Sequence, residues 1–222
     1  MNAILDPVDE KPSTSATQNA YETLRTMIVT GALLPGEKLK ITALTGLLQT
    51  GASPIREALS LLTSDNLVER IDQRGFRAAP VNLTNFEEIL TLRCELEVMA
   101  LRQSLALRDE AWEEQVVLSH HRMVRAQGEA RFEALHKAFH MALISKCQGP
   151  ILLKFCSQLY DLNIRYRYLA GRAENYKSRD VTAEHQAILD AVLEGDADTA
   201  AHSLVGHYRG TGAYLGDVLD LA

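Results

Sequence analysis

The chain has 222 residues, of which 46% are hydrophobic and 23% charged, and its formal net charge is −6. This composition predicts a folded chain with room for one large or two smaller domains, and it excludes a disordered one. No run of about 18 apolar residues occurs and the first residues are polar, so we expect an unexported, cytoplasmic protein that does not cross a membrane. The three cysteines, Cys94, Cys147 and Cys156, are widely spaced, which favours buried, reduced thiols over disulfides.

The acidic net charge argues against a nucleic-acid binder, because DNA affinity depends on neutralising phosphates. The distribution of charge matters more than the total. Between residues 38 and 77 the chain is mildly basic, with six basic side chains against four acidic ones. The basic ones are Lys38, Lys40, Arg56, Arg70, Arg74 and Arg77.

Residues 1–15 lack an apolar period and predict a flexible leader. From about Thr17 apolar residues fall at helical spacing until Gly31, where the chain turns. A short extended piece at 38–41 follows, and then a small helix from about Thr42 to Gly51. These elements begin a domain that we expect to cover residues 16–80.

The next helix is expected from Pro54 to Asp65, with Ser53 as its N-cap and Pro54 at the first helical position. Two strand-like runs, 67–71 and 75–79, then form a β-hairpin. Helix, strand, helix, helix and hairpin is the order of a winged helix-turn-helix.

In such a fold the helix after Ser53 enters the major groove, and the hairpin tip approaches the adjacent backbone or minor groove. Arg56 is the best-placed reader of bases, and Arg74 with Gly75 forms the tip. Lys40, Ser53 and Pro54 complete the predicted DNA contacts. A helical domain whose hairpin has no part in DNA binding is the alternative.

After a linker at 81–84, a predicted capping box at Thr84 to Glu87 opens an all-helical domain, 85–222. Its apolar spacing predicts about six helices in an antiparallel bundle, so the fold class is mainly α. The six expected ranges are 85–107, 110–127, 130–147, 150–171, 180–194 and 197–218.

Histidines give the chemical signal in this domain. His136 and His140 are four residues apart on one helix, and His185 and His207 lie on the last two helices. A bundle could bring these imidazoles together as ligands of a divalent ion such as zinc or nickel. Surface or core histidines without a metal are the alternative.

Four linked motifs in the first domain resemble the signature of the GntR family of regulators. They are GALLPGEKL at 31–39, SPIREAL at 53–59, NLV at 66–68 and RGF at 74–76. The resemblance implies a DNA-binding transcriptional regulator. The family commonly has an arginine where this chain has Ala52, so the operator need not follow the family norm.

The second domain resembles the C-terminal FCD domain of the FadR-type branch, through RCELE at 93–97, Phe139-His140, Glu184-His185 and the run from 195 to 207. That resemblance implies a metal held by one aspartate and three histidines beneath a cavity for a small carboxylate. His140, His185 and His207 match the histidine positions, whereas His136 occupies the aspartate position. His136 is therefore a candidate fourth ligand that favours zinc or nickel over manganese. Glu133 is the alternative ligand, and a site without metal is a third possibility.

A carboxylate effector needs a cationic anchor. Arg93 matches a family position that often faces the cavity, and a guanidinium can bind a carboxylate through two hydrogen bonds. Arg165, Tyr166 and Arg167 are further candidates, because at least one side chain in this stretch should face inward. Which one does so is left open, and a surface ion pair is the alternative for each arginine.

These features predict a homodimeric regulator, a repressor before an activator, that binds a palindromic duplex operator and responds to a small organic acid. A metal sensor, in which the ion itself is the effector, is the alternative. An enzyme is not expected: His136 to His140 has the histidine spacing of a zinc protease, but Lys137 stands where the glutamate base should be.

Overall fold

A computed structural model describes residues 15–72, 74–170 and 180–220 of the chain. The chain divides into two compact units, Met1–Pro80 and Val81–Ala222, which are treated separately below. The predicted leader lies outside the described residues except for Ser15, and so does Gln73 at the tip of the predicted hairpin.

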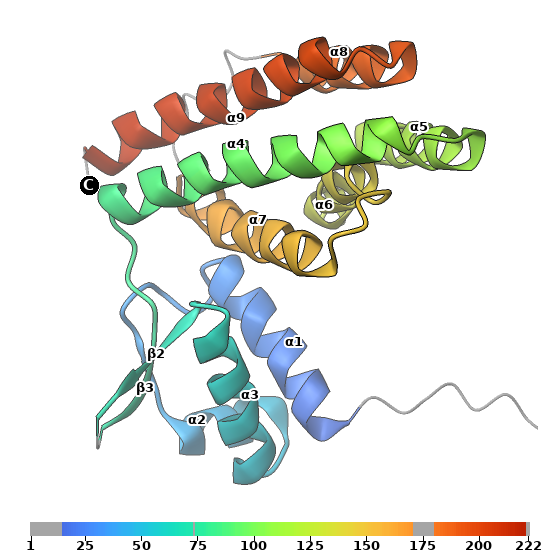
Figure 1. The fold of residues 1–222 in the computed structure, drawn as a ribbon. Helices are drawn as coiled ribbons and strands as arrows, with labels where there is room; N and C mark the ends of the chain where they lie inside the picture. The colour runs from blue at the N-terminus through green and yellow to red at the C-terminus, as the bar shows by residue number, and fades with distance from the viewer. Residues whose placement is uncertain (1–14, 73, 171–179, 221–222) are drawn as a thin grey trace, which may run out of the picture. The chain divides into compact units, whose positions relative to one another are not determined.

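The described part of the first unit contains three helices and a small antiparallel sheet (Figure 1). The strands have the order β1-β3-β2, and the register pairs Glu69 with Arg77 across the hairpin. The sequence of elements is that of a winged helix, which confirms the predicted fold class. The elements are α1 (Ala16–Val29), β1 (Lys38–Leu39), α2 (Ile41–Leu48), α3 (Ala52–Ser64), β2 (Val68–Ile71) and β3 (Gly75–Ala78).

The core of this unit forms where α1 packs against α3. Leu24 and Ile28 of α1, and Ile55, Leu59 and Leu62 of α3, are fully buried. Their helical spacing places them on one face of each helix, so the opposite face of α3 is left for solvent or a ligand.

The start of α3 differs from the prediction. Gly51, in an extended conformation, is the N-cap, so that Ser53 and Pro54 are the second and third helical residues. Pro54 is still tolerated because the N–H groups of the first turn have no partner within the helix. Ser53 does not cap the helix: its hydroxyl donates to Glu57 Oε1 at 3.3 Å.

The second unit is a bundle of helices, and six of them lie in its described part, as predicted (Figure 1). The long helix α4 packs against both α7 and α9, while α5 packs against α6 and α8, and α8 against α9. The helices are α4 (Leu83–Ala106), α5 (Glu110–Arg125), α6 (Phe132–Leu143), α7 (Pro150–Ala170), α8 (Val181–Glu194) and α9 (Ala197–Asp220).

The beginning of α4 also corrects the sequence interpretation. The helix begins at Leu83, inside the stretch expected as a linker, and its N-cap is Asn82 rather than Thr84. The Asn82 side chain accepts a hydrogen bond from the Asn85 backbone N–H at 2.8 Å. An asparagine oxygen satisfies the N-terminal donors as well as a hydroxyl does, so it can end the linker two residues earlier.

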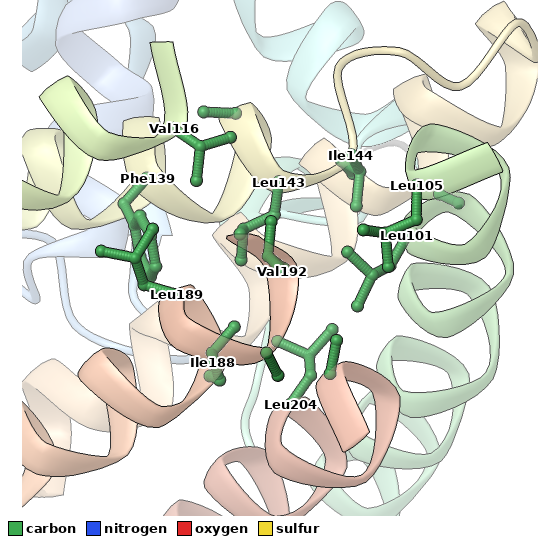
Figure 2. Close-up of a cluster of buried hydrophobic side chains, with 14 of the residues drawn as sticks. Leu101, Leu105, Val116, Phe139, Leu143, Ile144, Ile188, Leu189, Val192 and Leu204 are labelled. Carbon is green, nitrogen blue, oxygen red and sulfur yellow. The ribbon is translucent and has the colours of Figure 1, made fainter. Parts of the chain in front are cut away.

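The bundle core is formed by buried side chains from helices α4 to α9 and from the turn after α6, and Figure 2 shows part of it. Phe139 and Leu143 of α6 lie in this core with Leu101 of α4 and Ile188 and Val192 of α8. The three cysteines are buried and unpaired, as expected. Among the described residues, no helix is both long and apolar enough to cross a bilayer.

Candidate functional site

The exposed first turn of α3 carries the side chains predicted to meet DNA. Ser53 and Arg56 are exposed and Pro54 is half-buried, whereas Ile55 points into the core. Glu57 accepts hydrogen bonds from Ser53 and, at 2.8 Å, from Thr17 of α1. The Arg56 guanidinium is thus presented beside a fixed helix start, whose N–H groups favour phosphate.

The hairpin presents a second exposed basic position. Arg74 and Gly75 are exposed at the start of β3, and Gly75 has a φ of +92°, a conformation that favours glycine. Arg77 forms an ion pair with Glu69 at 2.6 Å across the strands. Lys40 is exposed just before α2.

In the second unit the four predicted histidines come together. His136 and His140 of α6, His185 of α8 and His207 of α9 are all buried. Each offers a ring nitrogen, and these nitrogens lie within 4.8 Å of one another. In a tetrahedral zinc site with Zn–N distances of about 2.1 Å, the ligand nitrogens are about 3.4 Å apart, so the cluster would have to contract to become a coordination shell.

Burial keeps the α6 imidazoles uncharged. It lowers the pKa of both His136 and His140 well below the usual value, and the neighbouring histidines add to the effect. A neutral imidazole has the lone pair that a metal ligand requires.

Hydrogen-bond partners outside the cluster hold its imidazoles. His140 Nδ1 lies 3.0 Å from the Tyr208 hydroxyl, and His207 Nδ1 lies 2.8 Å from Glu184 Oε2. A carboxylate accepts only, so Nδ1 of His207 donates to it and Nε2 retains a lone pair. His140 Nε2 is buried and has no hydrogen-bond partner among the described residues.

His136 is held differently. Its Nδ1 lies 2.5 Å from the Tyr160 hydroxyl and 3.4 Å from Arg167 NH1, and its Nε2 lies 3.1 Å from Nε2 of His185. The position expected for an aspartate is therefore filled by an imidazole that contacts another imidazole within the cluster.

Arg93 lies at the edge of the cluster and is only 4% exposed. Its guanidinium donates to Glu97 at 2.7 Å and to Asn163 at 2.9 Å, and it stacks 4.0 Å from the centre of the Tyr208 ring. Burial opposes its charge, but Glu97, Tyr208 and Tyr160 together outweigh burial, so the pKa of Arg93 is raised. The remaining nitrogen, NH2, is buried without a hydrogen-bond partner among the described residues.

The three candidates on α7 separate in space. Arg167 reaches the cluster, where it lies 3.0 Å from Glu133 as well as near His136. Tyr166 instead packs on Phe86, 5.0 Å between ring centres, and its hydroxyl donates to Asn85. Tyr166 therefore packs beside the start of α4, and its predicted contact with the effector stays a prediction.

Arg165 is buried rather than exposed at the surface. Glu133, the alternative metal ligand, is paired with Arg167, and burial raises the pKa of its carboxyl group. The histidines, not Glu133, form the close group of potential ligands.

Sequence reasoning gave no role to several side chains around the cluster, namely Glu97, Tyr160, Asn163, Glu184 and Tyr208. A helical stripe on α7, with Tyr160, Asn163 and Arg167 three and four residues apart, could have indicated one inward face. The pairing of Arg93 with Glu97 at i,i+4 was also visible. The positions of Tyr208 and Glu184 depend on how α8 and α9 pack.

The residues present fit a divalent metal. Several neutral nitrogens converge in a buried volume, and their outer nitrogens are held by hydroxyl and carboxylate groups, the arrangement that orients metal-binding histidines. A cationic nitrogen of Arg93 remains available nearby for an anion.

Comparison with known proteins identifies the families of the two units. Residues 16–77 match the family model of bacterial regulatory proteins, gntR family, and residues 88–210 match that of the FCD domain. The HTH-type transcriptional regulator BphR of Paraburkholderia xenovorans is 35% identical over 87% of this chain and 82% of its own. The HTH-type transcriptional repressor GlaR of Escherichia coli is 29% identical over 87% of this chain and 93% of its own.

Among solved structures, that of E. coli McbR/YncC has the same fold, with a TM-score of 0.79 at 24% identity, covering 91% of this chain and 97% of that one. The family and these relatives are transcriptional regulators, which confirms the prediction of a regulator and not an enzyme. The chain thus belongs to the GntR family of DNA-binding transcriptional regulators, and its second unit is an FCD domain.

Proposed function

We propose that this regulator binds a palindromic duplex operator as a homodimer, and that a small carboxylate bound beside a divalent metal in the FCD domain changes its operator affinity. The α3 start, with Ser53, Pro54 and Arg56, reads the major groove, and Arg74 with Gly75 contacts the adjacent backbone or minor groove. Lys40 adds a phosphate contact. Two half-sites double the contacts of a short recognition helix, which is the reason for the dimer.

The observation that carries the metal proposal is the convergence of the four buried histidines, with ring nitrogens within 4.8 Å. His140, His185 and His207 are the proposed ligands, and His136 completes the cluster beside them. Nitrogen donors favour zinc or nickel, and the bound ion would attract an anion to the site.

Arg93 is the proposed second anchor of the effector. Its NH2 group is desolvated without a partner, and leaving a buried donor unpaired costs about 1–3 kcal/mol. A carboxylate would satisfy this donor. Arg167, which lies between Glu133 and His136, is close enough to the cluster to contribute to the same positive environment.

We propose repression as the direction of regulation, because GlaR is named a repressor. An effector that binds one arrangement of the dimer better than the other releases or strengthens operator binding accordingly.

Elemental analysis of the full chain, followed by chelation and a thermal-shift screen, tests the proposal. We expect about one zinc or nickel ion per chain, and a stabilisation by small mono- or dicarboxylates that only the metal-loaded protein shows. Chelation that leaves both stability and ligand response unchanged would rule out the metal anchor.

A metal sensor is the second candidate, because four histidines around one ion would fill a tetrahedral site and leave no position for a carboxylate. In that case metal titration alone would shift operator affinity, and carboxylates would add nothing.

A further inference from the structure

The two histidines of α6 sit in opposite hydrogen-bonding environments, although they are one helical turn apart and both face the cluster. Which ring nitrogen of a neutral histidine carries the proton is decided by its partners, and a nitrogen that carries the proton cannot bind a metal. The surrounding side chains therefore decide which histidines are ready to be ligands.

For His140 the deciding group is Tyr208. The Tyr208 hydroxyl has a single proton and donates it to Glu97 Oε2. Its oxygen is left to accept from His140 Nδ1 at 3.0 Å, so the proton of His140 is on Nδ1. Nε2 then carries a lone pair, and this is the atom that is buried without a partner.

Glu97 is itself fixed, because its other oxygen accepts from Arg93 Nε at 2.7 Å. The direction of the hydrogen bonds from Tyr208 to Glu97 and from His140 to Tyr208 is thereby determined.

For His136 the direction is reversed. Arg167 can only donate, and its NH1 lies 3.4 Å from His136 Nδ1. The Tyr160 hydroxyl, 2.5 Å from the same nitrogen, has no other acceptor among the described residues. Both groups donate to Nδ1, so the proton of His136 is on Nε2, where it is donated to His185 Nε2 at 3.1 Å.

We propose that Tyr208 and Arg167 hold the two α6 histidines in opposite tautomers, so that His140 is a metal ligand and His136 is a hydrogen-bond donor within the cluster. Tyr208, Glu97 and Arg167 are positioning residues in this arrangement. The consequence rests on the proposed function. In the loaded site the lone pair of His185 Nε2 would go to the ion instead of accepting from His136, and His136 would keep its Nε2 proton without becoming a ligand. Three histidines would then bind the ion, and a coordination position would stay open for the carboxylate, as in three-ligand zinc sites.

The tautomers can be read directly in the metal-free full chain, by nitrogen-15 NMR of labelled histidine near neutral pH. We expect His140 protonated on Nδ1 and His136 on Nε2. In Tyr208→Phe the His140 proton should move in part to Nε2. The matched control is Tyr166→Phe, which removes another buried tyrosine hydroxyl, one that contacts Asn85 instead. The same tautomer in both histidines, or no change in Tyr208→Phe, would overturn the inference.

Zinc and cobalt titrations then compare one substitution at two positions. In His136→Gln the amide can still donate to His185 and accept from Arg167, so we expect zinc affinity near that of the wild type and an unchanged visible cobalt spectrum. His140→Gln should weaken zinc binding by more than a hundredfold, because it removes a ligand. Tyr208→Phe should weaken zinc binding by about tenfold to a hundredfold, as is typical when a residue that hydrogen-bonds to a ligand is lost. Equal losses in His136→Gln and His140→Gln would make His136 a ligand and overturn the inference.

Different results would contradict the proposed metal site and the proposed tautomers. A wild-type chain that binds neither zinc nor cobalt contradicts the proposed metal site, whereas the NMR measurement on the metal-free chain still decides the tautomers. Circular dichroism of each variant shows whether a lost affinity reflects a lost fold.

Discussion

The two units of this regulator hold their functional side chains in contrasting ways. In the winged helix, Arg56 and Arg74 are exposed on elements whose stability comes from other residues, such as Ile55 and Leu59. In the FCD domain, Arg93 and the histidines are buried and joined through hydrogen bonds. We infer that DNA contacts can change one at a time, whereas a change in the effector site also changes stability.

The largest expected effect is a loss of stability of the FCD domain when Glu97 is replaced. Glu97→Ala leaves the Arg93 charge buried without its carboxylate partner, which should destabilise the FCD domain by about 3–5 kcal/mol. Urea denaturation, followed by a probe in the second unit such as Trp112, measures this loss. Glu97→Gln, which keeps a hydrogen-bonding group, should lose less. An alanine variant as stable as the wild type would remove the contrast between the units.

Metal removal should also act on one unit. At a free zinc concentration a hundredfold above the dissociation constant, binding to the folded state adds about 2.7 kcal/mol. Chelation should therefore lower the melting transition of the FCD domain and leave that of the winged helix in place. Differential scanning calorimetry distinguishes the two, and an equal shift of both transitions would contradict a metal site confined to the histidine cluster.

Arg56→Ala tests the opposite unit. We expect a loss of about 1–3 kcal/mol in specific DNA binding for each half-site, since a bidentate contact to a base is lost. Thermal stability should not change, because the side chain is exposed. Fluorescence anisotropy with a duplex selected in vitro by the full chain measures the effect. Specific binding that persists unchanged would exclude Arg56 from base reading.

The smallest expected effect comes from placing an arginine at position 52, where the resemblance to the GntR signature implies one. Ala52 is exposed in the first turn of α3, so Ala52→Arg adds a cation without disturbing the core. One added phosphate contact should increase the salt dependence of DNA binding by about one unit of slope. A slope equal to that of the wild type would mean that position 52 does not face the phosphates.

The sequence allowed the fold and the histidine cluster to be predicted for a physical reason. Helical periodicity determines which face of α6 is buried, so His136 and His140 had to point the same way. The N-caps were harder to predict. Ser53 and Thr84 are good capping residues and lie within two residues of the observed caps, Gly51 and Asn82.

The hydrogen bonds around the cluster could not be predicted, because they join residues far apart in the chain. Tyr208 meets His140 only because α9 packs beside α4 and turns this side chain inward. Arg167 and Tyr166 are neighbours in sequence, yet one reaches the histidines and the other packs on Phe86. Such choices depend on the rotation of a helix about its axis, which local sequence determines only to within a residue or two.

In our proposal, the buried site of the FCD domain controls DNA binding by the exposed site of the winged helix. Its most direct test is the affinity of the full chain for the selected duplex when metal-free, zinc-loaded, and zinc-loaded with succinate, citrate or lactate. We predict that at least one carboxylate changes DNA affinity about fivefold or more, and only in the zinc-loaded protein. The same affinity in all three states, with a folded protein and bound zinc, would contradict the account.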